Sequence, residues 1–126
     1  AEKSPAPTLN QVNLTAAEAH DMFARLVDDL AIMLENHRVH ADLSAYNILY
    51  WEGQFKIIDF PQAVDPRRNP DAPALFIRDV ERVCQYFARY RIHPDAHRLA
   101  NDLWSRFHLT NALDSSAPTP AENLDA

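Results

Sequence analysis

The chain has 126 residues, a formal net charge of −6, one glycine and one cysteine. This length suits a single domain, and the lone cysteine excludes an intramolecular disulfide framework and a thiolate zinc cluster, which is typical of a cytoplasmic protein. The acidic charge argues against a DNA-binding surface, no apolar run approaches the roughly 20 residues of a membrane helix, and one glycine cannot supply a glycine-rich phosphate loop.

The first 14 residues contain two prolines and little hydrophobic periodicity, so we expect a flexible leader over residues 1–14. The pattern changes at Thr15, which can form a capping box with Glu18 at a helix start. Beyond it, apolar residues recur at intervals of three and four residues. This spacing predicts a long amphipathic helix over residues 16–36.

Two β-rich runs follow, residues 48–51 and 55–58, and Gly53 between them can adopt the positive φ of a tight turn. They predict a short β-hairpin. The next segment, residues 60–73, holds four prolines and is expected to be irregular and to lie on the surface.

Apolar residues at helical spacing predict two more helices, over residues 74–91 and 95–108. The residues after 110 have no apolar stripe and are rich in Ala, Ser, Pro and acidic residues, which favours a disordered tail. We therefore expect a folded domain over residues 15–110 and a tail over residues 111–126.

Polar residues gather on the two sides of the predicted hairpin. Asp42 and Asn47 precede its first strand, and Asp59 follows the apolar second strand. If the loop before the hairpin folds back over the end of that strand, the three side chains converge. The Asn47 amide and the Asp59 carboxylate suit Mg²⁺, which takes one or two protein oxygens together with water and substrate phosphates. Asp42 would then be free to orient or deprotonate a hydroxyl group.

This spacing resembles the catalytic and metal loops of the protein-kinase-like phosphotransferases. Three runs are similar to the RIO family of atypical serine/threonine kinases: HADLSAYNIL from His40, IDFPQAVD from Ile58, and RDV from Arg78. The resemblance covers residues 37–90. Ser44, where related phosphotransferases carry a basic or histidine residue, favours the RIO family over the aminoglycoside and choline phosphotransferases, which stay an alternative.

The resemblance implies a role for each polar residue of these runs. Asp42 is the catalytic aspartate, Asn47 binds metal and nucleotide, and Asp59 is the metal-loop aspartate that also becomes transiently phosphorylated. His40 is then a buried structural residue, Ser44 supports the loop, and Asp79 accepts backbone N–H bonds from the catalytic loop and so supports Asp42. By residue type alone, His37, His40 and Asp42 could instead be zinc ligands, which is the weaker interpretation.

The same resemblance implies an α+β, mostly α-helical fold: the C-terminal lobe of a protein-kinase-like domain, with a short hairpin carrying the catalytic and metal loops and the N-terminal lobe absent. ATP with Mg²⁺ or Mn²⁺ would be the cofactor and a protein the substrate, with a ribosome-related partner. Neither Lys3 nor Lys56 can be the nucleotide lysine, so we expect the isolated chain to be inactive. Position 41, glycine in most RIO kinases, is alanine here and must do without a permissive φ.

A non-catalytic interaction module, such as a pseudokinase lobe, is the third hypothesis. A lobe separated from its partner exposes apolar surface and would tend to self-associate. The intact set of Asp42, Asn47 and Asp59 argues against a decayed active site. The basic residues Arg67 and Arg68 are expected to be solvated surface charges.

Overall fold

The computed structural model describes residues 6–107. They form, in chain order, α1 (Ala16–Glu35), β1 (Ile48–Trp51), β2 (Gln54–Ile57), α2 (Ala72–Phe87) and α3 (Ala96–Arg106), with 3₁₀ turns at Leu9–Gln11, Ala45–Asn47 and Ala88–Tyr90. The two strands form one antiparallel sheet. The predicted α+β, mostly α-helical fold class is confirmed.

The first helix begins at the predicted cap. The hydroxyl of Thr15 accepts a hydrogen bond from the Glu18 amide at 3.1 Å, and the Thr15 amide donates to the Glu18 carboxylate at 2.8 Å. This exchange satisfies two of the amides that a helix start leaves unpaired. The buried face of α1 is Ala19, Met22, Leu26, Leu30 and Leu34. The helix therefore follows the apolar spacing and ends one residue before the predicted boundary.

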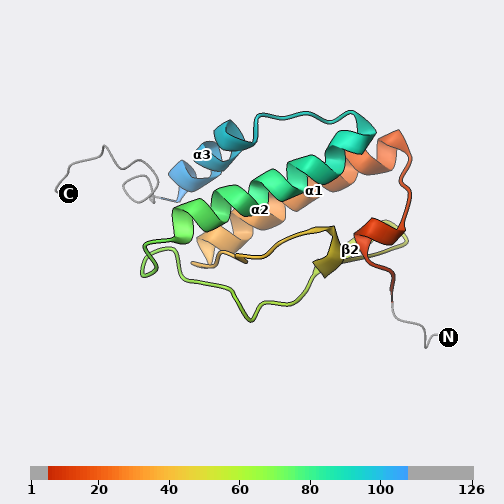
Figure 1. The fold of residues 1–126 in the computed structure, drawn as a ribbon. Helices are drawn as coiled ribbons and strands as arrows, with labels where there is room; N and C mark the ends of the chain where they lie inside the picture. The colour runs from red at the N-terminus through yellow and green to blue at the C-terminus, as the bar shows by residue number, and fades with distance from the viewer. Residues whose placement is uncertain (1–5, 108–126) are drawn as a thin grey trace.

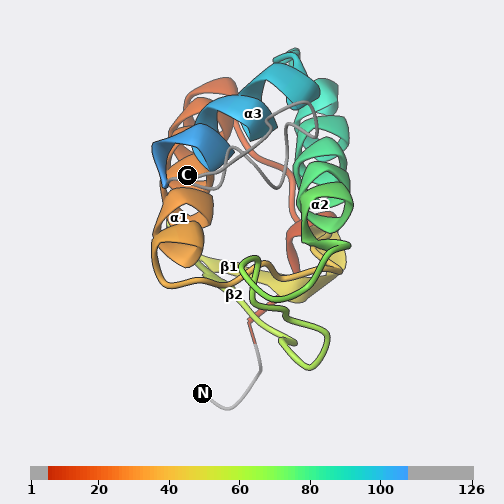
Figure 2. The ribbon, with the colours of Figure 1, turned by 90° about the vertical axis from the view of Figure 1, so that its left-hand side faces the viewer.

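The other two helices frame the core together with α1. In Figure 2, α1 and α2 stand on opposite sides and α3 packs against both. The aromatic rings of Phe76 on α2 and Trp104 on α3 lie 5.5 Å apart, and both side chains are buried. The start of α2 lies two residues before the predicted one because Pro73 occupies its first turn, where no N–H is required.

In both views the hairpin lies below α1 and α2, on the side away from α3 (Figures 1 and 2). Ile48 pairs with Ile57 and Trp51 with Gln54. The turn residues Glu52 and Gly53 have φ values of 47° and 78°. Two successive positive φ angles are the pattern of the tight hairpin turn that matches strand twist, so the predicted role of Gly53 is confirmed.

The segment before α1 packs on the core, where the sequence predicted a flexible leader. Thr8 forms a β-bridge with Leu49, and the Tyr50 amide donates to the Pro7 carbonyl at 2.9 Å. Leu9 is 1% exposed, and its carbonyl accepts a hydrogen bond from the Tyr86 hydroxyl. The segment is too short to show hydrophobic periodicity, so its order could not be predicted from the sequence. That order comes from pairing with the edge of β1. The predicted tail lies outside the described residues.

A second β-bridge joins the segment before the hairpin to the segment after it. Val39 and Val64 exchange two backbone hydrogen bonds of 2.9 Å. This bridge brings the start of one polar run beside the end of the other. Within residues 6–107, no helix is both long and apolar enough to cross a membrane.

Candidate active site

The loop between α1 and β1 is shaped by its own side chains. The Ser44 hydroxyl accepts from the Tyr46 amide at 3.2 Å, and the Ser44 amide donates to the Oδ1 atom of Asn47 at 2.8 Å. The Asn47 Nδ2 group donates to the Asp42 carbonyl at 2.7 Å. These local bonds close the loop on itself and hold Asp42 and Asn47, five residues apart, on the same turn.

His40 connects this loop to the end of β2. Its ring is fully buried, Nδ1 accepts from the Asp42 amide at 3.2 Å, and Nε2 lies 2.8 Å from the Ile58 carbonyl. An amide only donates and a carbonyl only accepts, so the ring carries its proton on Nε2 and is neutral. Both nitrogens are occupied, which removes His40 as a zinc ligand.

Asn47 makes a second link to the same place. Its carbonyl accepts a hydrogen bond of 2.9 Å from the Ile58 amide. The amide and the carbonyl of Ile58 are thus both hydrogen-bonded to the loop, and Asp59 follows Ile58 directly. These hydrogen bonds therefore link the loop that carries Asp42 and Asn47 to Ile58, the residue that directly precedes Asp59.

Asp59 has a strained backbone and an accessible carboxylate. Its φ is 62°, a conformation that residues other than glycine adopt at a cost of about 1–3 kcal/mol. The residue is exposed, and no hydrogen bond or ion pair to its carboxylate occurs among residues 6–107. A free carboxylate next to a fixed loop can accept a cation or act as a nucleophile.

The buried Asp79 on α2 fixes the backbone around Asp42. Its Oδ2 accepts from the Ala41 amide at 2.8 Å, and its Oδ1 accepts from the Leu43 amide at 2.9 Å. Burial raises the pKa of Asp79, while these two amides and the charge of the neighbouring Arg78 oppose the rise. The Asp79 carboxylate thus binds the amides of the two residues that flank Asp42.

Ala41 has a φ of 76°, so the loop keeps the left-handed conformation at this position. The expectation that alanine would do without it is wrong. The Ala41 amide donates to Asp79, and the Ala41 carbonyl accepts from Arg78 at 2.7 Å. These two hydrogen bonds fix the peptide units on both sides of Ala41. The surroundings thus hold an alanine where glycine fits more easily.

The side chain of Asp42 is half-exposed and bonded to a residue that the sequence did not indicate. Its Oδ1 lies 3.0 Å from the Nη1 atom of Arg82, on α2. Arg78 and Arg82 are four residues apart and flank Asp79 on one side of the helix. The four-residue spacing places Arg78 and Arg82 on one helix face and can be seen in the sequence. Nothing in the sequence shows which loop that face contacts.

Comparisons with known proteins identify the family of this chain. The model of the RIO domain family matches residues 1–99. The chain belongs to the RIO domain family. It is 37% identical over 90 residues to the RIO-type serine/threonine-protein kinase Rio2 of Methanocaldococcus jannaschii, covering 71% of this chain and 33% of that protein. It is 32% identical over 98 residues to Rio1 of Thermoplasma acidophilum, covering 78% of this chain and 50% of that protein.

The fold of this RIO domain also has a solved counterpart. A crystal structure of the Rio2 kinase from Chaetomium thermophilum, in a complex with ADP, Mg²⁺ and phosphoaspartate, matches 88% of this chain and 38% of its own with a TM-score of 0.63 and 23% identity. The likeness supports the kinase-like fold. The chain spans a third to a half of the two archaeal relatives.

The candidate metal ligands of this RIO domain are the oxygen atoms of Asn47 and Asp59. Among the described residues, no group of three or more His, Cys, Asp or Glu side chains could hold a metal ion, so the zinc interpretation has no support there. The Oδ1 atom of Asn47 uses one lone pair for the Ser44 amide and keeps another. Together with the Asp59 carboxylate it would provide the two hard donors that suit Mg²⁺ bound partly through phosphates.

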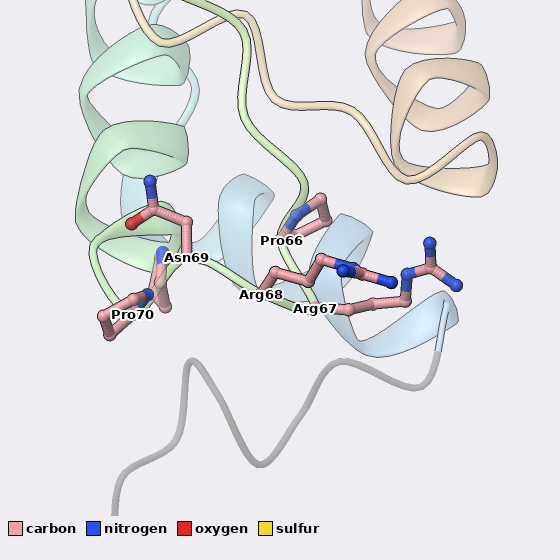
Figure 3. Close-up of a pocket in the computed structure, with 6 residues that line it drawn as sticks. Pro66, Arg67, Arg68, Asn69 and Pro70 are labelled. Carbon is pink, nitrogen blue, oxygen red and sulfur yellow. The ribbon is translucent and has the colours of Figure 1, made fainter.

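A surface pocket of about 340 Å³ lies on the loop that leads into α2 (Figure 3). It is lined by Pro66, Arg67, Arg68, Asn69, Pro70 and Pro73. None of the site residues lines it. Arg67 is bonded to Asp65, which holds the pKa of that carboxyl at about 2. The arginines are exposed, and Arg67 makes this local contact, consistent with solvated surface charges.

Proposed function

We propose that this RIO domain forms the catalytic side of an ATP-dependent serine/threonine protein kinase, with Asp42 as the catalytic aspartate. The observation that supports this is the shared contact at Ile58, whose carbonyl binds His40 and whose amide binds Asn47. Around it lie a half-exposed carboxylate, an amide oxygen with a spare lone pair and an unpartnered carboxylate. Phosphoryl transfer relies mainly on positioning and on charge stabilisation, and these groups suit both.

Asn47 and Asp59 would hold the Mg²⁺ or Mn²⁺ that accompanies ATP. A bound metal of this kind neutralises charge on the transferring phosphates. Asp42 would accept a hydrogen bond from the hydroxyl of the protein substrate and so align its oxygen with the γ-phosphorus. His40, neutral and bonded at both nitrogens, takes no proton in this scheme and keeps the two loops in register.

A transient phosphoaspartate at Asp59 is part of the proposal. The fold relative from Chaetomium thermophilum is described as a phosphoaspartate complex, and the exposed Asp59 carboxylate is available for the same chemistry. Its oxygen would bond to the γ-phosphorus as the bond to the bridging oxygen of ADP breaks. Attack by water on the phosphorus would then release phosphate and restore the carboxylate, which gives an ATPase cycle.

The test uses the longer protein that contains this chain, with Asp42→Asn and Asp59→Asn variants and Asp102→Asn, an exposed residue of α3, as the control. We expect phosphoryl transfer to fall by about 100-fold or more in both site variants. The control should keep wild-type rates. Near-normal transfer and ATP hydrolysis in both site variants would contradict the proposal.

The same assay separates the alternatives. Phosphorylation of an amino alcohol or sugar without any protein phosphorylation would favour a small-molecule phosphotransferase. A wild-type protein that neither transfers phosphate nor hydrolyses ATP would favour the interaction module. A ribosome-related partner stays a prediction from the family.

A further inference from the structure

One side of α2 contacts three successive residues of the catalytic loop. Asp79 binds the amides of Ala41 and Leu43, and Arg78 binds the Ala41 carbonyl. These contacts reach only backbone atoms. Arg82, one turn further along, is the residue of this helix that bonds to the side chain of Asp42, with Nη1 3.0 Å from Oδ1.

The contact fixes an otherwise mobile group. The Asp42 side chain is 50% exposed and that of Arg82 is 38% exposed. An exposed aspartate can rotate about two side-chain bonds, whereas a charge-assisted hydrogen bond to one oxygen selects a single orientation. Half-exposed ion pairs contribute little to folding stability, because solvent screens them. The pair therefore matters more for the direction of the carboxylate than for the fold.

The loop has no other cation that could do this. Residues 40–47 contain no lysine or arginine, and both nitrogens of His40 are occupied. Arg82 reaches Asp42 from a helix that is anchored in the core by the buried Val80 and Val83. A rigid helix is a better base for orienting a reactive group than the loop itself.

We propose that Arg82 is a positioning residue for Asp42. By binding Oδ1 it directs Oδ2 toward the place of the acceptor hydroxyl and keeps Asp42 from turning away. This inference rests on the proposed function, because it assigns Arg82 a part in the same transfer. It acts on the acceptor side only, since Asn47 and Asp59 would hold the nucleotide.

The test compares Arg82→Met, which keeps an unbranched apolar side chain without the guanidinium group, with Arg82→Lys in the longer protein. Arg98→Met, an exposed arginine of α3, is the matched control. For Arg82→Met we expect kcat for transfer to the protein hydroxyl to fall by about 10- to 100-fold, with ADP affinity within about twofold of wild type. Arg82→Lys should recover part of the rate, and Arg98→Met should behave as wild type.

A double-mutant cycle shows whether Arg82 works through Asp42. In an Asp42→Asn background, Arg82→Met should lower the rate no further, because the group that it positions is already lost. In the 126-residue chain, the side-chain carboxyl carbon resonance of Asp42 should shift in Arg82→Met and stay in place in Arg98→Met.

Three results would overturn the inference: full transfer activity in Arg82→Met, a parallel loss of ADP affinity, or an unchanged Asp42 resonance. Its failure differs from failure of the proposed function. An inactive Asp42→Asn with an active Arg82→Met overturns only the role of Arg82, whereas an active Asp42→Asn overturns the assignment of Asp42 itself.

Discussion

Ala41 shows how a single backbone angle joins fold and function in this domain. Its φ of 76° orients its amide toward Asp79 and its carbonyl toward Arg78. For a residue with a Cβ atom, this region costs about 1–2 kcal/mol. The loop thus carries strain at the residue that precedes the proposed catalytic aspartate, and neighbouring hydrogen bonds maintain it.

We expect Ala41→Gly to stabilise the domain by about 0.5–1 kcal/mol, because glycine adopts this conformation without strain and the lost methyl group offsets part of the gain. Urea denaturation of the chain measures the change. The matched control is Ala24→Gly on the exposed face of α1, which should destabilise by about 1 kcal/mol. Equal destabilisation in both variants would show that φ at position 41 carries no strain.

Asp65 gives the loop before α2 a pH-dependent contact. The side-chain hydrogen bond from Arg67, followed by the one from its amide, lowers the pKa of Asp65 to about 2. A lowered pKa means that the contact is complete above the ordinary aspartate pKa of about 3.9 and is lost as the pH falls toward 2.

We expect Arg67→Gln to raise the pKa of Asp65 toward its ordinary value without reaching it, because the Arg67 amide still donates to the carboxylate. NMR titration of the Asp65 carboxyl carbon follows this directly. Arg68→Gln is the control, since the Nε atom of Arg68 is 3.8 Å from the carboxylate and should matter less. An equal rise in both variants would contradict the contact with Arg67.

At the scale of elements, α2 is the helix on which the site depends. It buries apolar residues against the core on one side and presents Arg78, Asp79 and Arg82 to the catalytic loop on another. The segment before α1 contacts the C-terminal end of α2 and the turn that follows it. The Tyr86 hydroxyl on α2 binds the Leu9 carbonyl, and the Tyr90 hydroxyl accepts from the Leu14 amide.

We expect Leu9→Ala to destabilise the domain by about 2–4 kcal/mol, because Leu9 is fully packed in the core and its loss leaves a cavity. Asn13→Ala, at an exposed position of the same segment, should stay within about 0.5 kcal/mol of wild type. Denaturant unfolding of both variants measures the difference. A Leu9→Ala protein as stable as the control would restore the interpretation of this segment as a flexible leader.

At the scale of the whole molecule, the chain covers 33% and 50% of its two archaeal relatives. The groups proposed to bind the metal and align the acceptor lie within it, whereas no glycine-rich loop does. Ile32 and Phe60 are 53% and 40% exposed and line one surface pocket of about 310 Å³. Self-association through such apolar surface stays a prediction.

We expect the isolated chain to bind ATP·Mg²⁺ only weakly, with a Kd of about 1 mM or more, because two oxygen ligands alone give little affinity. A longer protein containing this chain should bind at least about tenfold more tightly. Isothermal titration calorimetry compares the two, with Asp59→Asn as a control that should weaken binding in the longer protein. Micromolar binding by the isolated chain would contradict the expectation.

The helices and the hairpin could be predicted from the sequence alone, whereas the functional roles of Asp42, Asn47 and Asp59 stay a prediction. Helix caps, apolar spacing and turn glycines act over a few residues, so a short stretch of sequence is enough to recognise them. The family resemblance rests on the same short-range order of residues.

The tertiary structure decided the contacts between distant segments. Leu9 is ordered by β1 and α2, and Arg82 meets Asp42 across 40 positions of sequence. The φ of Ala41 follows from bonds to α2 rather than from the preference of alanine. Each of these depends on which surfaces the packed core brings together, and local propensity carries no information about that.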